Sequence, residues 1–409
     1  MCEAALPWKA RGVTVHARDT LQDRIRQEIA ARADRLWQVA LALHRDPETA
    51  FQEERAAALL TEELRANGFE VETAVAGLPT AFRARAGTGS APTAALLLEY
   101  DALPEIGHAC GHNLIAAAGL GAALALRAVV PDGAGTIMAV GTPAEESGGG
   151  KVIAVEAGLF DEVDAALMFH PGVYDWAQAP LTASAQLRVA FSGRAAHPTG
   201  NPTEGIDALA ALIEFFNTLS GLGRRLPPGS HVQGIVTDGG KATNIVPDHA
   251  EGLFGLRGAT TTARRELETL LGTCADGIAR ATGTTVDVTP VGTGYEHFRD
   301  SDVLSARFTG YLAPAGIHLG DPVPGVYLGS SDIGNVSHRV PAVHPFVSIM
   351  DGGSDHTPEF AAAAASPRGR TVMLAAAEAL ARTAADVLLD PEVRAAAWRQ
   401  FRDSAAAGL

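Results

Sequence analysis

The sequence has little cysteine. Three cysteines, Cys2, Cys110 and Cys274, are spread over 409 residues. An odd number of widely separated cysteines does not fit a disulfide framework, which is typical of small secreted domains. The first residues contain no apolar segment of the length that a secretory signal requires. We therefore expect a cytoplasmic protein in which one thiol has a function.

Positive charge and long apolar runs are also scarce. The formal net charge is -15, and no basic run occurs, which argues against a nucleic-acid partner. No uninterrupted apolar stretch reaches the roughly 18 residues of a membrane span, so none is predicted. Hydrophobic residues make up 47% and charged residues 19% of the chain, which is typical of a globular protein. Because 409 residues exceed one ordinary core, we expect two domains.

What the chain does contain is an alternation of helices and buried strands. Apolar residues at helical spacing predict helices over 21–45, 52–66 and 113–130, and an alanine-rich C-terminal helix from Ala361 on. Short apolar runs predict strands buried on both faces. These strands are expected at 94–98, 136–140, 165–169, 326–328 and 346–349.

Candidate ligands follow these strands. Asp101 follows the first, the pair Glu145 and Glu146 follows the second, and His170 follows the third. Asp332 and His356 lie beyond the last two. Because sites in open α/β sheets form at the carboxyl ends of strands, this recurrence predicts an active site at one sheet edge.

The pattern changes between about 183 and 291. The expected order there is strand, helix, strand, strand, helix, strand, with elements at 186–192, 204–222, 231–236, 252–256, 262–282 and 285–288. This βαββαβ order is typical of a ferredoxin-like unit. We therefore predict a discontinuous catalytic domain, 1–182 and 293–409, with an inserted domain at 183–292.

The densest group of candidate ligands lies in EYDALPEIGHACGHN, from Glu99 to Asn113. A cysteine and a histidine two residues apart on a glycine turn, Cys110 and His112, can both bind one metal ion. Together with the acidic pair Glu145 and Glu146 and the later histidines, they suit a two-metal hydrolytic site.

These segments resemble a known family. The chain resembles the M20-type metallopeptidases, in the amidohydrolase branch that carries a Cys-Gly-His motif. Within that branch it is similar to the subgroup called M20 domain-containing protein 2, the aminoacylase-1-like dipeptidases. The matching pieces span nearly the whole chain: HRDPETAFQEERAAALLTEEL from His44, EYDALPEIGHACGHN from Glu99, GTPAEESGGGK from Gly141, MFHP from Met168, SGRAAHP from Ser192, ATNIVPD from Ala242, GSSDIGNVS from Gly329 and HTPEF from His356.

The resemblance implies a fold and a metal centre. The fold would be α/β, a mixed-sheet, zinc-peptidase-like catalytic domain with an inserted ferredoxin-like domain for closure and dimerisation. Two divalent metal ions per chain would be bridged by Cys110 and also bound by His112, Glu146, His170 and His356. Zinc is the first expectation, with manganese, cobalt or nickel as alternatives. Asp101 would orient a ligand without binding metal, and His108 would either support a ligand in the same way or be structural. The alternatives for Cys110 are an inert buried thiol and a redox thiol.

The resemblance also implies catalytic and substrate-binding groups. Glu145 would be the general base. His197 would reach across a homodimer to polarise the substrate carbonyl, and Asn244 and Arg257 would hold the substrate's amide and carboxylate. The bland alternatives are a surface histidine, a turn-forming asparagine and a solvated arginine.

The expected activity is hydrolysis of a small dipeptide or N-acyl amino acid with a free carboxylate. An aryl-amide hydrolase of the p-aminobenzoyl-glutamate type is an alternative. A non-catalytic metal-binding protein is a further one, although it would be expected to lack a ligand or the base.

Overall fold

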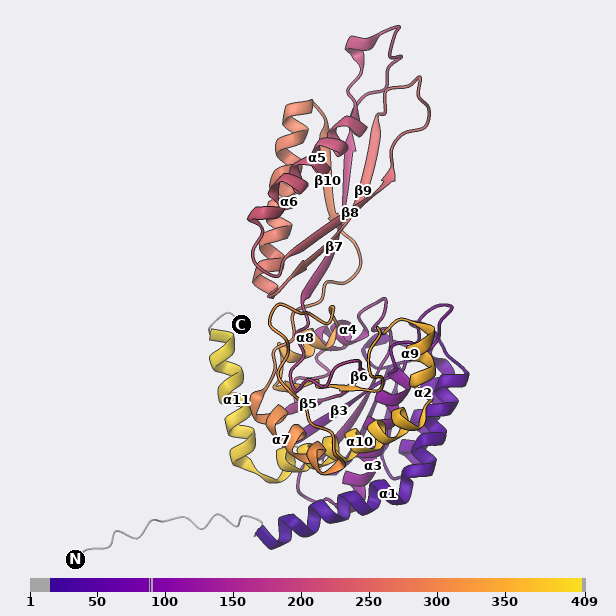
Figure 1. The fold of residues 1–409 in the computed structure, drawn as a ribbon, viewed down its shortest axis with the longest axis vertical. Helices are drawn as coiled ribbons and strands as arrows, with labels where there is room; N and C mark the ends of the chain where they lie inside the picture. The colour runs from indigo at the N-terminus through magenta and orange to yellow at the C-terminus, as the bar shows by residue number, and fades with distance from the viewer. Residues whose placement is uncertain (1–14, 88, 90, 407–409) are drawn as a thin grey trace, which may run out of the picture. The chain divides into compact units, whose positions relative to one another are not determined.

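The structure is a computed structural model that describes residues 15–87, 89 and 91–406, so Cys2 lies outside the described part. The chain folds into two compact units (Figure 1). The first comprises residues 15–179, Arg299–Pro322 and 339–406, and the second comprises Pro180–Phe298 and Val323–His338. The second unit thus takes in 323–338 as well as the segment expected to be inserted. The division at 182 and 293, and the role of the insertion in closure, stay predictions.

A mixed six-stranded sheet forms the centre of the first unit. Its strand order is β1-β2-β4-β3-β5-β11. The four strands β4, β3, β5 and β11 run parallel, whereas β1 and β2 are antiparallel to their neighbours. Their bounds are Glu70–Thr73 (β1), Phe82–Gly87 (β2), Thr93–Glu99 (β3), Thr136–Thr142 (β4), Ala165–Leu167 (β5) and Ala342–Val343 (β11). A short parallel pair, β6 (His170–Gly172) and β12 (Phe346–Ser348), lies apart from this sheet.

Helices cover the sheet of the first unit. Strands β3 and β4 are buried along their whole length, as expected for parallel strands covered on both faces. A single apolar core joins the sheet to α1 (Val15–Arg45), α3 (His112–Val129) and α10 (Pro367–Leu389). Helix α3 is long and apolar enough to cross a bilayer, but 89% of it is buried inside the protein. It is therefore a core helix that fixes the position of the Cys-Gly-His turn at its start.

Shorter helices complete the unit. They are α2 (Glu54–Ala66), α4 (Gly150–Glu156), α7 (Asp302–Leu312), α9 (Pro358–Ala363) and α11 (Pro391–Ala406).

One predicted strand is wrong. Residues 326–328 form no strand, and Val326 and Tyr327 are 37% and 41% exposed. The run is apolar and lies between Gly325 and Gly329, both with positive φ, and it pairs with none of the described strands. As a consequence, Asp332 does not follow a sheet strand and precedes the short helix α8 (Ile333–Ser337) of the second unit.

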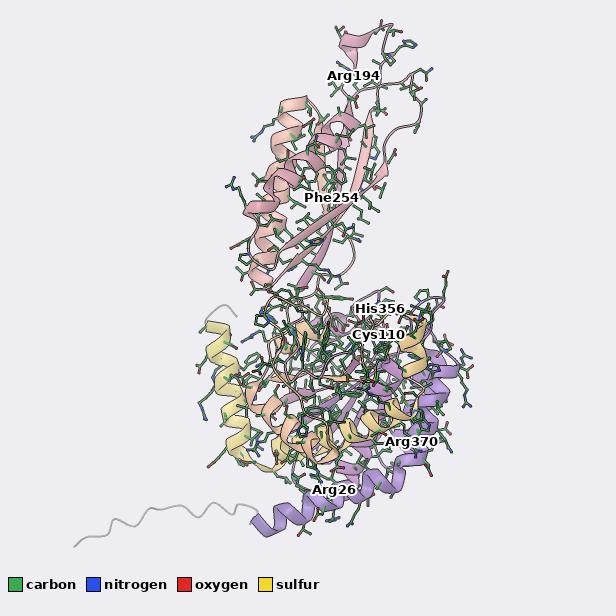
Figure 2. All side chains as sticks on the ribbon, viewed as in Figure 1. Arg26, Cys110, Arg194, Phe254, His356 and Arg370 are labelled. Atoms are coloured by element: carbon green, nitrogen blue, oxygen red, sulfur yellow. The ribbon has the colours of Figure 1, made fainter. Side chains whose placement is uncertain are left out.

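The core of the second unit is a four-stranded antiparallel sheet packed against two long helices, α5 and α6. The chain order β7-α5-β8-β9-α6-β10 is the expected βαββαβ order, and the strand order is β10-β7-β9-β8. Both helices pack with the sheet around Phe254 (Figures 1 and 2). The bounds are Ala183–Ser192 (β7), Ala208–Leu222 (α5), His231–Asp238 (β8), His249–Gly258 (β9), Thr261–Thr282 (α6) and Thr285–Pro290 (β10).

Candidate active site

The candidate ligands meet at the carboxyl ends of the parallel strands. The turn that carries Cys110 follows β3, the Glu145–Glu146 loop follows β4, and His170 follows β5. Figure 2 shows Cys110 and His356 close together, at the other end of the first unit from Arg26. The sheet edge expected from the sequence is therefore where these side chains gather.

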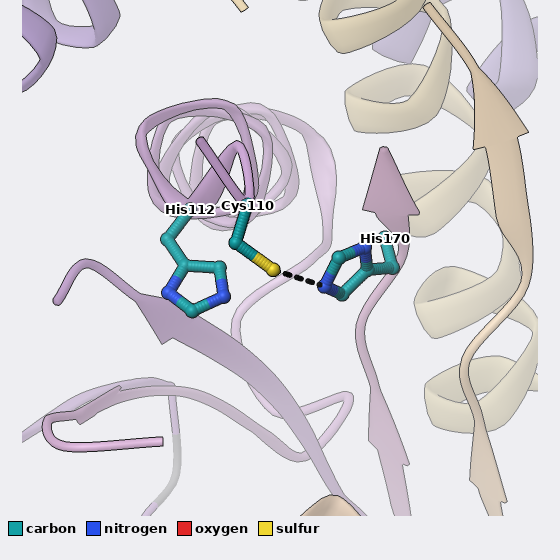
Figure 3. A group of neighbouring side chains, drawn as sticks. All are labelled: Cys110, His112 and His170. Carbon is teal, nitrogen blue, oxygen red and sulfur yellow. Dashed lines mark hydrogen bonds between the residues drawn. The ribbon is translucent and has the colours of Figure 1, made fainter. Parts of the chain in front are cut away.

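Three overlapping groups of described side chains have the geometry of a metal site: one of Glu99, His112 and Glu145, and two that share Cys110. Of these two, one comprises Cys110, His112 and His170, and the other comprises Cys110, Glu146 and His356, with the ligand atoms of each group within 4.8 Å of one another. Figure 3 shows the group that contains His170, in which Sγ of Cys110 lies 3.5 Å from Nε2 of His170. Nε2 of His356 lies 3.6 Å from Oε1 of Glu146. Because Cys110 belongs to both of these groups, its sulfur is the atom placed to bridge two ions.

Hydrogen bonds orient both buried histidines toward the centre. Nδ1 of His112 lies 2.9 Å from the carbonyl oxygen of Asp101 and 3.2 Å from its Oδ1. Nδ1 of His170 lies 2.6 Å from the carbonyl oxygen of Pro171. Each Nδ1–H donates to these oxygens, so the lone pair on Nε2 faces the other ligands, as in histidines that bind metal. The carbonyl and carboxylate oxygens of Asp101 thus hold the His112 ring in this orientation.

Buried polar atoms at the centre fit a divalent cation. Oε1 of Glu146 and Nε2 of His112 accept or donate no hydrogen bond among the described residues. Nε2 of His112 lies 3.0 Å from Oε1 of Glu99. The lone pairs of this nitrogen and this oxygen repel each other at that distance unless a proton or a metal ion lies between or beside them. The mixture of thiolate, imidazole and carboxylate suits zinc and other divalent transition metals.

The pKa shifts follow from the same burial. Burial raises the pKa of the Cys110 thiol well above its ordinary value, so the thiol needs a cation beside it to ionise. Burial lowers the pKa of His170 to about 4, which keeps the ring neutral. Burial is the largest influence on the pKa of His112 and acts to lower it, but the charges of Glu99 and Cys110 and the hydrogen bond to Asp101 together outweigh burial, so the pKa is raised well above its ordinary value. A metal ion bound at Nε2 would take the place of that proton.

A buried ion pair lies beside the cluster. Oε2 of Glu99 accepts a hydrogen bond from Nζ of Lys151, and both side chains are fully buried. Glu99 ends β3 and Lys151 lies in the first turn of α4. The lysine compensates part of the negative charge that the carboxylates bring to this edge.

Three residues at this centre were not predicted from the sequence. Glu99 and Lys151 had no predicted role, and His344 was expected to be structural. His344 follows β11 directly, is fully buried, and its ring centroid lies 5.5 Å from that of His170. The signal available for Glu99 was its place at the end of a buried apolar strand. For His344 the two-residue strand Ala342–Val343 is too short to recognise from the sequence.

Two further expectations concern His108 and the cysteines. His108 is buried, stacks on His44 with ring centroids 6.3 Å apart, and has a pKa lowered by burial to about 3. It is not a member of the ligand groups found among the described residues. Both described cysteines, Cys110 and Cys274, are free thiols.

The expected carbonyl donor His197 and the expected substrate-binding residues Asn244 and Arg257 belong to the second unit. His197 is exposed, and its Nδ1 accepts hydrogen bonds from the backbone amides of Thr199 and Gly200 at 3.3 and 3.0 Å. The neutral ring therefore carries its proton on Nε2, as a donor to a ligand must. Asn244 and Arg257 are also exposed, and Arg257 donates to Oγ of Ser330 at 2.6 Å. Their action on a substrate stays a prediction.

Comparison with known proteins identifies the family. The model of peptidase family M20/M25/M40 matches residues 95–383. The chain is 35% identical to the Xaa-Arg dipeptidase of Mus musculus over 404 residues, which cover 94% of this chain and 93% of that protein. It is 34% identical to one of the chains of p-aminobenzoyl-glutamate hydrolase from Escherichia coli over 283 residues, or 64% of this chain and 57% of that protein.

A solved structure supports the fold. An aminohydrolase from methicillin-resistant Staphylococcus aureus superposes with a TM-score of 0.77 and 21% identity, over 90% of this chain and 100% of that one. At this identity the likeness concerns the fold alone. The family match and the dipeptidase relative carry the assignment, and the chain therefore belongs to peptidase family M20/M25/M40.

Proposed function

We propose that this hydrolase is a dinuclear metallo-dipeptidase that cleaves a small dipeptide or N-acyl amino acid. One observation carries the proposal. The five ligands expected from the sequence, Cys110, His112, Glu146, His170 and His356, gather in two groups that share the sulfur of Cys110. Divalent ions held there would acidify a water molecule and polarise the scissile carbonyl. Zinc is the metal we propose first.

Glu145 is the proton carrier in this proposal. It lies on the loop after β4, next to the ligand Glu146, and its side chain is 9% exposed. The carboxylate accepts a proton as water attacks the amide carbon, and returns it to the nitrogen of the leaving amine. His197, with its proton held on Nε2, donates to the carbonyl oxygen as negative charge develops on it. Asn244 and Arg257 bind the substrate's backbone amide and free carboxylate.

The substrate class follows from the relative that covers most of the chain. The similarity to the Xaa-Arg dipeptidase extends over 94% of the chain, so dipeptides that end in arginine are the first substrates to test. The guanidinium of Arg257 would take their carboxylate by paired hydrogen bonds. A second candidate, hydrolysis of p-aminobenzoyl-glutamate, is favoured by the 34% identity to the Escherichia coli hydrolase chain.

We also propose that the enzyme is a cytoplasmic homodimer. Strand β8 is an edge strand of the second unit, and its side chains Ile235 and Val236 are 59% and 50% exposed. An exposed apolar edge strand offers unpaired backbone groups to a second copy. Dimerisation would bring His197 of one protomer to the other's substrate. The free thiols of Cys110 and Cys274 support the cytoplasmic location.

The test is a substrate panel on metal-free protein. Dipeptides ending in arginine or other residues, N-acyl amino acids and p-aminobenzoyl-glutamate are offered before and after addition of zinc, manganese, cobalt or nickel. We expect metal-restored cleavage of dipeptides, fastest with a C-terminal arginine. Cleavage of p-aminobenzoyl-glutamate alone would select the second candidate. Protein that binds two ions but cleaves no amide in the panel would contradict the proposed substrate class.

A further inference from the structure

A buried carboxylate outside the ligand set contacts the loop that carries the base. Glu53 is fully buried just before α2. Although it occupies the N-cap position, its side chain makes no capping hydrogen bond. Its Oε1 instead accepts from the backbone amides of Phe51 at 2.9 Å and of Ala144 at 3.0 Å. Ala144 directly precedes Glu145, so the bond joins a distant segment to the catalytic loop.

The other oxygen of Glu53 is held in place as well. Oε2 accepts from Oγ1 of Thr80 at 2.8 Å. The carbonyl oxygen of Thr80 in turn accepts from the hydroxyl of Tyr100 at 2.6 Å. Tyr100 is fully buried and directly follows β3. The Glu53 carboxylate is therefore held by hydrogen bonds at both oxygens. Through Thr80 and Tyr100 its position relative to Ala144 depends on strand β3 of the central sheet.

The loop that Glu53 contacts has a backbone conformation that needs support. Ala144 has φ of +61°, a left-handed conformation that is strained for a non-glycine residue. Its carbonyl oxygen accepts from the amide of Gly149 at 2.9 Å, which closes the loop. At Gly148 a Cβ would lie 2.3 Å from the ring of Phe51. The loop is thus tightly packed against the segment that carries Glu53.

Two carboxylates hold the backbone on either side of Glu145. Glu53 accepts from the amide before it, at Ala144, and Oδ2 of Asp101 accepts from the amide after it, at Glu146, at 2.9 Å. Fixing both neighbouring peptide units restricts the backbone of Glu145 and so the direction of its side chain.

We propose that Glu53 is a positioning residue that holds the Ala144–Glu146 backbone so that the Glu145 carboxylate faces the reacting water. This inference rests on the proposed role of Glu145 as general base. Glu53 does not touch the substrate or the ligand atoms in this account. Removing its carboxylate leaves the amides of Phe51 and Ala144 without their partner and releases the left-handed turn. A displacement of about 1 Å at a catalytic group can lower a rate about 10²-fold.

The test is a double-mutant cycle between Glu53 and Glu145. We expect Glu53→Ala to lower kcat about 10²-fold with little change in KM, while bound metal stays at the wild-type amount. In the Glu145→Ala background the same substitution should lower the residual rate no further, because the base it positions is gone. Glu53→Gln keeps an oxygen that can accept from both amides, and should restore most of kcat.

Glu48 supplies the matched control. It lies in the same segment, and its oxygens accept from the backbone amides of Arg55 and Ala56 rather than from the catalytic loop. Glu48→Ala should therefore keep kcat. If Glu53→Ala does not fold, Glu53→Asp keeps the charge but is too short to reach Ala144, and should also lose kcat.

The outcomes separate the two claims. Equal losses from Glu53→Ala in both backgrounds, or loss of bound metal, would overturn the positioning role. So would a Glu53→Asp variant with wild-type kcat, or a Glu48→Ala variant as impaired as Glu53→Ala. A Glu145→Ala enzyme with wild-type rate would instead overturn the general-base assignment on which the inference rests.

Discussion

The two units of the chain hold their functional side chains in opposite ways. In the first, Cys110, His112 and His170 are buried, and backbone or carboxylate oxygens orient both histidine rings. In the second, His197, Asn244 and Arg257 are exposed. A buried, preorganised cluster can bind ions and move protons within its own unit. Exposed polar groups can act on a molecule supplied from outside their unit. On the proposed roles, the groups that would bind the ions and carry the proton belong to the first unit, and the groups that would contact the substrate belong to the second.

The largest effect should come from the base in the first unit. Glu145→Ala should lower kcat by about 10²–10⁴-fold, because it removes the carboxylate that takes the proton from water. The bound metal should stay at two ions per chain. Steady-state kinetics and metal analysis of the same preparation give both values, with Glu156→Ala, an exposed carboxylate on α4, as the control. A Glu145→Ala enzyme with the wild-type kcat would show that Glu145 is not the general base.

The next effect tests the exposed donor of the second unit. His197→Ala should lower kcat by about 10²–10³-fold, as loss of an oxyanion donor does, without change in bound metal. His249→Ala, at a partly exposed histidine of the same unit, is the control. Mixing His197→Ala with Glu145→Ala protein should regain activity if the donor acts on the partner's substrate. Failure of such mixtures to recover any rate would place the donor and the base in one protomer.

A smaller effect is expected at the substrate carboxylate. Arg257→Lys keeps the charge but cannot form paired hydrogen bonds, so KM should rise about tenfold with kcat nearly unchanged. Arg265→Lys, at an exposed arginine of the same unit paired with Glu296, should change neither value. Substrate saturation curves of the two variants and the wild type measure kcat and KM separately. A fall in kcat without a rise in KM would show that Arg257 acts on the transition state rather than on substrate binding.

The smallest effect concerns stability and Glu53. Burial raises the pKa of Glu53 from 4.5 to about 7, with the negative charge of Asp101 adding to the shift. The folded chain therefore binds a proton that the unfolded chain releases. This contribution is present below about pH 4.5 and is lost as the pH rises through about 7. The Glu53→Gln variant has no such titrating group. Between pH 4.5 and 8 the free energy of unfolding of the wild type should therefore fall by roughly 1–3 kcal/mol relative to that of Glu53→Gln.

Urea unfolding at several pH values measures this difference, and comparison with the variant cancels the titration of Tyr100, Asp101 and the other groups. Parallel stability curves for the two proteins would show that Glu53 has an ordinary pKa.

The parts of the fold and of the site that depend on local sequence patterns could be predicted from the sequence. Strands β3 and β4 were expected from runs of apolar residues because strands covered on both faces have no polar face to show. The site edge was expected because ligand residues recur after such strands. Strand β11 was not predicted because its two residues, Ala342 and Val343, are too few to show any periodicity. The apolar run 326–328 predicted a strand wrongly because nothing local to a sequence tells whether a strand finds a partner.

The roles of Glu53 and Glu99 could not be predicted for a different reason. Both are acidic residues near apolar segments, a common pattern with no specific chemistry. Only the fold brings Glu53 to Ala144, 91 positions away, and Glu99 to Lys151, 52 positions away. Groups that support a site through distant contacts leave no signal in the spacing of the chain.

Metal stoichiometry measures the central claim most directly. Purified wild-type protein, stripped of metal and then titrated with zinc, should bind two ions per chain, because the five expected ligands form two groups, which meet at the sulfur of Cys110. Cys110→Ala removes one ligand from each group at once, so it should weaken both ions and abolish amide hydrolysis. Cys274→Ala, at the free thiol of the second unit, should leave both properties unchanged. A Cys110→Ala protein that still binds two ions tightly and hydrolyses its substrate at the wild-type rate would contradict the bridged two-metal site.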